Sequence, residues 1–284
     1  MNLTAGGYLK QATAKLPGDL SERDAQILLA SVIGHPRTWL LAHLDSPLTP
    51  PQLDSAAQAF SRLEAGEPLP YILGHWEFYG LDLNVTPDVL IPRPETELLV
   101  DKAIKWLTAQ PTKRSVADVG TGSGAIAISI AKNISDARIL ATDVSLAALQ
   151  VARNNAEKHG VSDRIDFLHG DLLPDASGHQ LETFDLICAN LPYIPTQTLS
   201  GLPIFGREPT LALDGGEDGL DLYRRLLEVA PKRLRPRGML LFEIEATQGI
   251  HALNLAFDTF AEAAISLHQD LARHDRLLEV QMRG

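Results

Sequence analysis

The chain has 284 residues, of which 45% are hydrophobic and 21% charged, a composition typical of a soluble globular protein and not of a disordered one. Its 25 basic and 36 acidic residues give a net charge of −11, which argues against a strongly basic nucleic-acid-binding protein. The single cysteine, Cys188, excludes an intramolecular disulfide framework. No apolar run approaches the roughly 18 residues of a membrane span, and the first residues lack a charged-then-apolar signal, so we expect a cytoplasmic protein without a membrane partner.

Residues 1–74 are predicted to form a small helical domain. Ser21, followed by acidic residues, is a good N-cap for one helix. A second helix is expected to open at Pro36, and a third to run from about Pro51 to Leu63. Because this segment holds five basic and seven acidic residues, it shows no cationic stripe, and we interpret it as a substrate-docking element.

Residues 75–90 are predicted to be a β-hairpin that links two domains. Aromatic and aliphatic residues flank Gly80, as expected for two short strands joined by a turn. The following segment, 91–97, carries two prolines and should be extended before a helix over about 95–109.

Residues 91–284 alternate between short apolar runs and helical segments, which predicts an α/β domain with a mostly parallel sheet covered by helices on both faces. The last two runs could close the sheet as an antiparallel edge. The expected strands are 115–119, 138–142, 164–168, 184–189, 238–244, 264–268 and 276–282. The expected helices between them are 124–132, 145–159 and 218–234.

A glycine-rich loop lies where the first strand of this domain meets the next helix. Glycines there allow a sharp turn and a close approach of the backbone to a ligand at the helix N-terminus. Asp143, which ends the next strand, could accept both ribose hydroxyls of an adenosine-like ligand. The candidate ligand-binding residues of the loop are Asp118, Gly120, Thr121, Gly122, Ser123 and Gly124.

The same glycines also satisfy a loose dinucleotide fingerprint, Gly120-x-Gly122-x-x-Ala125, so a nicotinamide enzyme is an alternative. Asp118 argues against that alternative, because a pyrophosphate would not favour a negative charge two residues before the first glycine.

Asn190-Leu191-Pro192-Tyr193 follows the fourth expected strand, which is apolar throughout. Ligands of open α/β sheets bind beyond the carboxyl ends of the strands, so this tetrad and the glycine loop should face one cleft. Taken alone, the tetrad is equally compatible with an ordinary strand-ending turn.

Together, these motifs resemble those of S-adenosylmethionine-dependent methyltransferases that act on planar amino groups. Within that class the chain resembles the HemK/PrmC family of protein-(glutamine-N5) methyltransferases, which modify peptide-chain release factors. Order and spacing hold from about residue 70 to 245. The segments that carry the resemblance are 71–74, 77–80, 91–97, 118–124, 190–193 and 207–209.

The resemblance implies a class I, Rossmann-like methyltransferase domain with a seven-stranded sheet. It implies S-adenosylmethionine as cofactor and S-adenosylhomocysteine as product. The glycine loop would hold the methionine end of the cofactor and Asp143 the ribose, Asp171 and Leu172 would flank the adenine, and Asn190 would also border the cofactor.

For the substrate, the hypothesis is that the Asn190 side-chain oxygen and the Leu191 carbonyl accept the two N–H bonds of a glutamine amide. Tyr193 would pack against the amide, and Pro192 would stiffen the turn. Arg93 and Glu208 are further candidates for substrate binding. Arg93, Glu95 and Glu97 could help to close the cleft, and Arg207 and Glu208 lie in a loop of about 194–216 that is long enough to cover the substrate. For each of these residues, a solvated ion pair is at least as good an interpretation.

The chain departs from the family at Leu191, where proline is usual. Asn-Leu-Pro-Tyr also occurs in ribosomal RNA adenine-N6 methyltransferases, but those place the extra domain last and have a basic surface. A ribosomal protein glutamine methyltransferase is a second alternative, which segment 91–97 disfavours. We therefore expect release factors as substrates, with no direct nucleic-acid partner and no bound metal.

Overall fold

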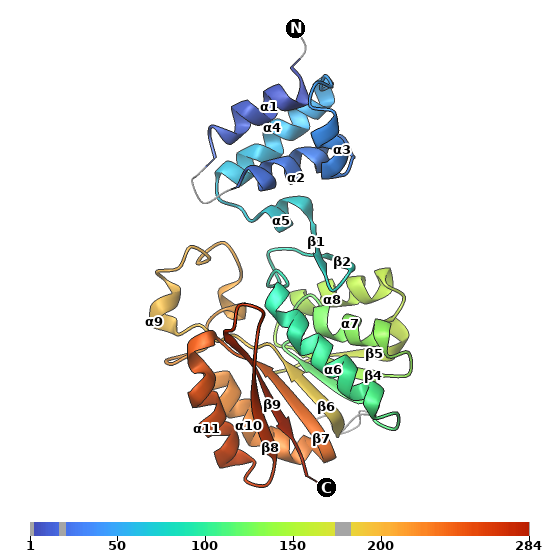
Figure 1. Cartoon of the computed structure of the whole chain (residues 1–284), viewed down its shortest axis with the longest axis vertical. Helices are drawn as coiled ribbons and strands as arrows, with labels where there is room; N and C mark the ends of the chain where they lie inside the picture. The colour runs from blue at the N-terminus through green and yellow to red at the C-terminus, as the bar shows by residue number, and fades with distance from the viewer. Residues whose placement is uncertain (1–2, 17–20, 174–182, 284) are drawn as a thin grey trace. The chain divides into compact units, whose positions relative to one another are not determined.

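The computed structural model describes residues 3–16, 21–173 and 183–283. The chain divides into two compact units, Met1–His75 and Trp76–Gly284. The first is helical, and the second contains a seven-stranded mixed sheet with flanking helices. The fold class predicted from the sequence is thereby confirmed (Figure 1).

Local capping signals define the helices of the first unit. The side chain of Ser21 accepts a hydrogen bond from the Asp24 backbone, and the Asp24 side chain returns one to the Ser21 backbone, which completes a capping box. The three expected helices are confirmed, and α1 and α5 are additional. The helices of this unit are α1 (Ala5–Thr13), α2 (Glu22–Ile33), α3 (Arg37–Ala42), α4 (Pro50–Glu64) and α5 (Leu69–Leu73).

The hairpin forms where the sequence predicts it, as β1 (His75–Phe78) and β2 (Leu81–Asn84). Its turn contains Tyr79 and Gly80, both with positive φ, at 53° and 72°. Phe78 and Leu83 are buried in the same hydrophobic cluster as the large sheet. The hairpin expected as a linker is therefore packed into the second unit.

The large sheet has the strand order β5-β4-β3-β6-β7-β9-β8. The first five strands in this order pair in parallel, and β9 is antiparallel to both of its neighbours, as the expected antiparallel edge requires. Its strands are β3 (Ser115–Val119), β4 (Arg138–Asp143), β5 (Ile165–His169), β6 (Phe184–Ala189), β7 (Leu234–Glu243), β8 (Ala264–Gln269) and β9 (Asp275–Gln281).

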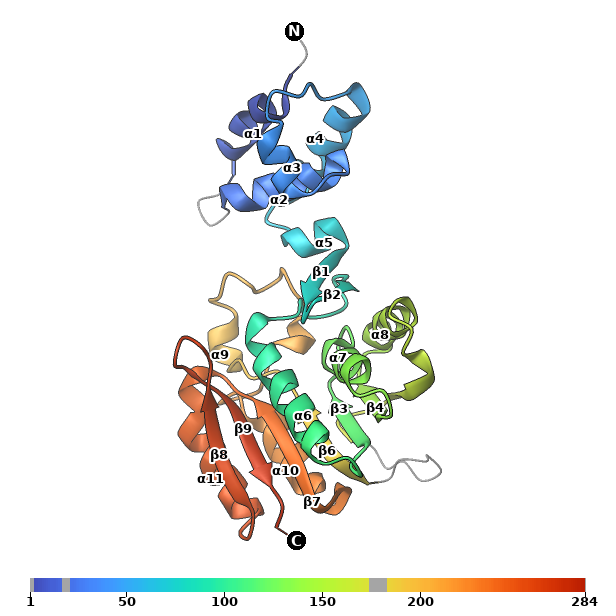
Figure 2. The ribbon, with the colours of Figure 1, turned by 45° about the vertical axis from the view of Figure 1, so that its right-hand side comes forward.

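Helices cover both faces of this sheet, with α6, α7 and α8 on one side and α10 and α11 on the other (Figures 1 and 2). Helices α9 and α11 were not predicted from the sequence. The helices are α6 (Glu97–Ala109), α7 (Ala125–Asn133), α8 (Leu146–Lys158), α9 (Thr196–Leu199), α10 (Asp221–Arg233) and α11 (Gly249–Thr259). Short 3₁₀ turns lie at η1 (Pro94–Thr96), η2 (Ser162–Arg164), η3 (Thr210–Ala212) and η4 (Ala246–Gln248).

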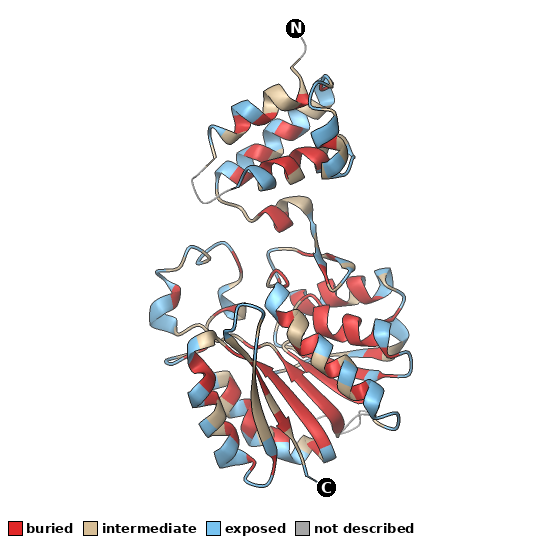
Figure 3. Cartoon of the chain, viewed as in Figure 1, coloured by how far each residue is buried: buried red, intermediate tan, exposed pale blue. Residues whose placement is uncertain are grey.

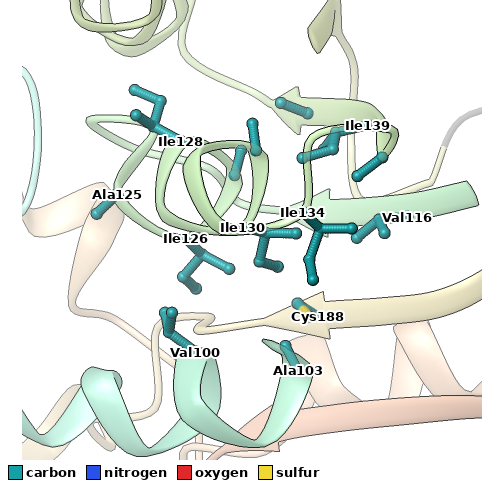
Figure 4. Packing of buried hydrophobic residues seen from close by; sticks show 14 of the residues in the cluster. Val100, Ala103, Val116, Ala125, Ile126, Ile128, Ile130, Ile134, Ile139 and Cys188 are labelled. Carbon is teal, nitrogen blue, oxygen red and sulfur yellow. The ribbon is translucent and has the colours of Figure 1, made fainter. Parts of the chain in front are cut away.

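The central strands are buried on both faces, which explains why they read as continuous apolar runs. All five residues of β3 and all six of β6 are buried (Figure 3). Successive residues of β3 enter opposite cores: Val116 packs with α6 and α7, whereas Ala117 packs with α10 and α11. Cys188 lies in the first core near Val116, so its thiol is enclosed by hydrocarbon (Figure 4).

The sheet reverses its direction of growth between β3 and β6. The strands that follow β3 in the chain, β4 and β5, add on one side of it, and β6 and β7 add on the other. The two connections leave the sheet in opposite directions, and this opens a crevice at the carboxyl ends of β3 and β6. The fold thereby determines where a ligand of this domain should bind.

Candidate active site

A cavity of about 320 Å³ lies at this crevice. Four of the predicted segments line it: Gly120–Ser123 after β3, Asp143 at the end of β4, Asp171–Leu172 after β5, and Asn190–Pro192 after β6. The structure therefore brings together segments that are separated by up to about 70 residues of sequence. A volume of this size suits a small organic ligand.

Asp118 supports the glycine loop from beneath and does not line the cavity. It is fully buried, and its Oδ2 accepts hydrogen bonds from the Thr121 hydroxyl at 2.6 Å and from the Ala127 backbone N–H at 3.1 Å. Burial raises the pKa of Asp118 to about 6. Its Oδ1 has no hydrogen-bond partner among the described residues. Asp118 thus fixes the start of the loop and leaves an unsatisfied acceptor beneath it.

The three glycines of the loop have different surroundings. A Cβ added to Gly122 would meet no atom within 4 Å, and its backbone has a φ of +54°. A Cβ at Gly124 would lie 2.9 Å from Ile128, and one at Gly120 would lie 2.9 Å from Leu191. Gly122 therefore exposes its backbone to the open cavity, whereas the other two glycines allow close packing.

Asp143 is held by backbone N–H groups on both of its oxygens. Oδ2 accepts from Gly122 at 2.9 Å, and Oδ1 accepts from Ser145 at 2.8 Å. Burial raises the pKa of the carboxyl group, while these hydrogen bonds and the charge of His169 act in the opposite direction. Each carboxylate oxygen retains a lone pair, so the group can still accept hydrogen bonds from a ligand in the cavity.

Asp171 and Leu172 lie at the cavity wall as predicted. Leu172 has a left-handed backbone with φ of 55°, and its carbonyl accepts a hydrogen bond from the Thr142 hydroxyl at 2.6 Å. Asp171 forms an ion pair with Arg225 of α10, which also lines the cavity. Arg225 was not predicted as a site residue, because nothing in the helix pattern distinguishes it from a surface cation.

Asn190 reaches the cavity, and its amide has a defined orientation. Nδ2 donates a hydrogen bond to the Thr96 hydroxyl at 2.9 Å. Thr96 is buried in the wall beside it, with an exposed fraction of 4%. Since the amide nitrogen is used on the protein side, Oδ1 is the end that can accept a hydrogen bond from a ligand.

The other tetrad residues separate into two groups. Leu191 and Pro192 line the cavity, and the Leu191 side chain is 3% exposed. Tyr193 does not line it: the ring packs against the core beneath α10 and α11, and the Tyr193 carbonyl accepts from Gln248 at 2.9 Å. Burial raises the pKa of its phenol. The structure thus places Tyr193 behind the cavity and not at its wall.

Arg93 and Glu208 pair with each other. Arg93 Nη2 lies 2.6 Å from Glu208 Oε1, and the Ile91 backbone N–H donates to Glu208 Oε2 at 3.0 Å. The Glu208 side chain is 5% exposed, so this is a mostly buried pair and not a solvated one. Arg93 lines the cavity and Glu208 does not, so the pair joins segment 91–97 to the loop before η3.

The remaining acidic residues of segment 91–97 act within the fold. Glu97 Oε1 accepts a hydrogen bond from the Tyr79 backbone at 2.9 Å, which ties α6 to the hairpin turn. Glu95 lies near the carboxyl group of Glu243 and raises its pKa. Arg207 is not part of the cavity wall.

Glu243 and Thr96 are site residues that the sequence analysis missed. Glu243 is the last residue of β7 and is 2% exposed. Burial raises its pKa to about 7, and hydrogen bonds from Thr96 and Asn190 act in the opposite direction. A carboxyl group at the end of a buried apolar strand is the signal that could have revealed it, because burying such a group is costly.

Within residues 3–16, 21–173 and 183–283 the structure offers neither a metal site nor a membrane-spanning helix. No group of three or more His, Cys, Asp and Glu side chains is placed to hold a metal ion. No helix in that part of the chain is both long and apolar enough to cross a membrane.

The strand order, the crevice at β3 and β6, and the glycine loop facing Asp143 define a class I methyltransferase domain. Models of known families match both parts of the chain: the PrmC N-terminal domain over residues 8–74, and the methyltransferase small domain over residues 95–200. A methyltransferase from Pyrococcus furiosus shares the fold, with a TM-score of 0.51 and 19% identity over 73% of this chain and 91% of that one.

Two relatives define the family more narrowly. The chain is 44% identical to the release factor glutamine methyltransferase of Moorella thermoacetica, over 96% of this chain and 97% of that protein. It is 40% identical to the enzyme of the same name from Geobacter sulfurreducens, over 82% of this chain and 80% of the relative. The chain belongs to the release factor glutamine methyltransferase family.

Proposed function

We propose that this protein transfers a methyl group from S-adenosylmethionine to the side-chain amide nitrogen of the glutamine in the Gly-Gly-Gln motif of peptide-chain release factors. The observation that carries the proposal is the meeting of Gly122, Asp143 and Asn190 in one cavity. Family membership supports it, since full-length relatives carry that name.

The cavity suits S-adenosylmethionine in three respects. The open backbone at Gly122 allows close approach, and the Asp143 carboxylate can accept ribose hydroxyls. The unsatisfied Oδ1 of Asp118 lies beneath the loop that would receive the positively charged methionine end. When bound, S-adenosylmethionine supplies an electrophilic methyl group on a sulfonium sulfur. Asp171 and Leu172 would flank its adenine, and the product would be S-adenosylhomocysteine.

An amide nitrogen is a poor nucleophile, because its lone pair is delocalised into the carbonyl group. Asn190 Oδ1 and the Leu191 carbonyl would accept the two N–H bonds and hold the lone pair towards the methyl group. With the methyl group supplied as an electrophile, the nitrogen would form the new N–CH₃ bond while the electron pair of the S–CH₃ bond stays with sulfur, and one N–H proton would leave to solvent. The protein contributes positioning and fixed dipoles, which can supply much of the reduction of a barrier.

Tyr193 would act on this reaction from behind the cavity, by supporting the tetrad's backbone through its packed ring. Pro192 would stiffen the same turn. Because release factors are proteins of the translation machinery, we expect the activity in the cytoplasm. The net charge of −11 does not favour RNA as a direct partner.

The proposal is tested by incubating the protein with methyl-labelled S-adenosylmethionine and a purified release factor, with ribosomal RNA in a parallel reaction. We expect label on the glutamine of Gly-Gly-Gln, located by mass spectrometry, and none after that glutamine is changed to asparagine. Labelling of the RNA alone would overturn the proposal.

Asn190→Ala should lower the rate of transfer by roughly 10²–10³-fold, the cost of removing one fixed dipole from such a site. Binding of S-adenosylmethionine, measured by calorimetry, should change little. Asn154→Ala makes the same change on the exposed face of α8 and should leave both quantities unaltered. Normal turnover of the Asn190 variant would exclude the acceptor role.

A further inference from the structure

Three side chains from distant parts of the chain form a connected group behind the cavity. Asn190 follows β6, Thr96 ends η1, and Glu243 ends β7. Asn190 Nδ2 donates to Thr96 Oγ1 at 2.9 Å. Ala189 pairs with Phe242 across β6 and β7, so the residues that follow them, Asn190 and Glu243, are neighbours, and the Thr96 hydroxyl lowers the pKa of the Glu243 carboxyl group. Of the three, Asn190 and Thr96 line the cavity and Glu243 lies behind them.

Glu243 is fixed at its backbone and buried at its side chain. The Tyr223 hydroxyl of α10 donates to the Glu243 carbonyl, and β7 pairs Glu243 with Leu277 of β9. The side chain is 2% exposed, and Oε2 has no hydrogen-bond partner among the described residues. Burying such a carboxyl group is costly, so we expect the group to have a function beside Asn190.

An ionised carboxylate can only accept hydrogen bonds. Facing Glu243, the Thr96 hydroxyl therefore donates its proton to the carboxylate and offers its oxygen lone pair to Asn190 Nδ2. In the reversed orientation of the amide, Asn190 Oδ1 would face the Thr96 oxygen and the Glu243 carboxylate, and these groups would repel each other. The arrangement thus selects one of the two orientations of the Asn190 amide.

We propose that Glu243 is a positioning residue, which acts through Thr96 to hold Asn190 with Oδ1 towards the substrate amide. This inference rests on the proposed function, because it concerns the same site. It adds the residue that determines which end of the Asn190 amide meets the substrate.

The surroundings of Glu243 allow it to be ionised near neutral pH. Burial raises its pKa to about 7, the nearby Glu95 acts in the same direction, and the hydrogen bonds and the charge of Arg276 oppose them. Since the pKa lies at about 7, the carboxylate form predominates above neutral pH and the protonated form below it.

The test compares Glu243→Gln with wild type in single-turnover transfer to a release factor. Glutamine keeps the size of the side chain but presents an N–H donor to Thr96, so the orientation of Asn190 is no longer selected. We expect the rate to fall roughly 10- to 100-fold, as small losses of alignment cost in such sites, with unchanged affinity for S-adenosylmethionine. Glu279→Gln, the same change at the Lys102 and His268 contacts of β9, should have no effect on the rate.

Thr96 offers a matched pair of variants. Thr96→Val keeps the shape and removes the hydroxyl, and should reproduce the defect of Glu243→Gln. Thr96→Ser restores the hydroxyl and should recover most of the rate. Because both residues act through one connection, the double variant should be no slower than the slower single variant. Additive losses, or equal rates for the valine and serine variants, would contradict the proposal.

Two further readouts separate positioning from folding and from the proposed function. Removing a buried charge should not lower the melting temperature of Glu243→Gln, whereas a structural role would lower rate and stability together. The side-chain NH₂ signals of Asn190 in ¹H–¹⁵N NMR spectra should shift in Glu243→Gln and in Thr96→Val. If wild type does not methylate release factors, the proposed function fails, and the NMR signals still decide the positioning role. A full rate or unchanged signals in Glu243→Gln would overturn it.

Discussion

Asn190 has a different partner on each side of its amide group. Its nitrogen donates to Thr96 at 2.9 Å, and its oxygen is the proposed acceptor for the substrate. Aspartate could accept hydrogen bonds on both sides but could not donate to Thr96, and it would place a second negative charge beside Glu243. The combination of one donor and one acceptor explains why an amide suits this position.

Asp143 supports the glycine loop and is also the proposed partner of the ligand's ribose. Asp143→Asn keeps the size of the side chain but removes its charge and one of its two acceptor oxygens. An amide would turn an N–H group towards the backbone N–H of Gly122 or Ser145, and one hydrogen bond would be lost. We expect the affinity for S-adenosylmethionine to fall roughly 10- to 100-fold in calorimetry, which corresponds to one hydrogen bond to a charged group. Asp166→Asn on the exposed side of β5 serves as the control. Wild-type affinity of the Asp143 variant would remove the ribose contact.

Leu191→Pro introduces the residue that is usual in the family. The carbonyl is retained, so the rate of transfer should stay within a few-fold of wild type. Stability should fall, by about 1–3 kcal/mol, because proline does not fill the buried space that the Leu191 side chain occupies against Gly120. Denaturant unfolding and the transfer assay measure the two effects. A loss of transfer with intact stability would show that the Leu191 side chain itself takes part.

At the scale of elements, part of the cavity wall comes from two segments that lie outside the α-helices and β-strands, 88–93 and 209–212. Glu208 joins them, because it accepts from Ile91 and pairs with Arg93. Glu208→Gln keeps the size but weakens the charged pair in a buried place, where unpaired charges are strongly destabilising. Proteolysis should therefore cut the loop before η3 faster than in wild type. Glu217→Gln, at an exposed position nearby, is the control, and equal cutting of both variants would refute the joining role.

Elements with local signals were predictable from the sequence. Ser21 and Asp24 form the expected capping box, and the buried strands show as apolar runs. Helix α11 begins without a side-chain cap at Gln248, so nothing local marked its start.

The site was predictable where its residues follow strands, as Asn190 and Asp143 do. The contact between Thr96 and Asn190 joins positions 94 residues apart, and no local pattern reports such a contact. The position of Tyr193 behind the cavity could not be predicted either, because it depends on packing against helices that are distant in the sequence.

At the scale of the whole molecule, buried carboxyl groups make stability depend on pH. The pKa of Asp118 rises from 3.8 to about 6 in the folded protein, so its favourable contribution is complete below about pH 4 and is lost as pH rises through about 6. Asparagine does not titrate, so the Asp118→Asn variant does not lose stability in this way as the pH rises. Relative to wild type, its free energy of unfolding should therefore increase between about pH 4 and pH 7, by on the order of 3 kcal/mol.

Denaturant titrations of the ligand-free protein at several pH values measure this difference. Asp258→Asn, an exposed site on α11, should show no such trend. A difference between Asp118→Asn and wild type that is independent of pH would contradict the raised pKa.

The measurement that tests the account most directly is a crystal structure with S-adenosylhomocysteine and the Gly-Gly-Gln domain of a release factor. We expect the glutamine nitrogen within hydrogen-bond distance of both Asn190 Oδ1 and the Leu191 carbonyl, in line with the sulfur that has lost its methyl group. A glutamine bound elsewhere, or an Asn190 side chain turned into the protein away from that sulfur, would contradict it.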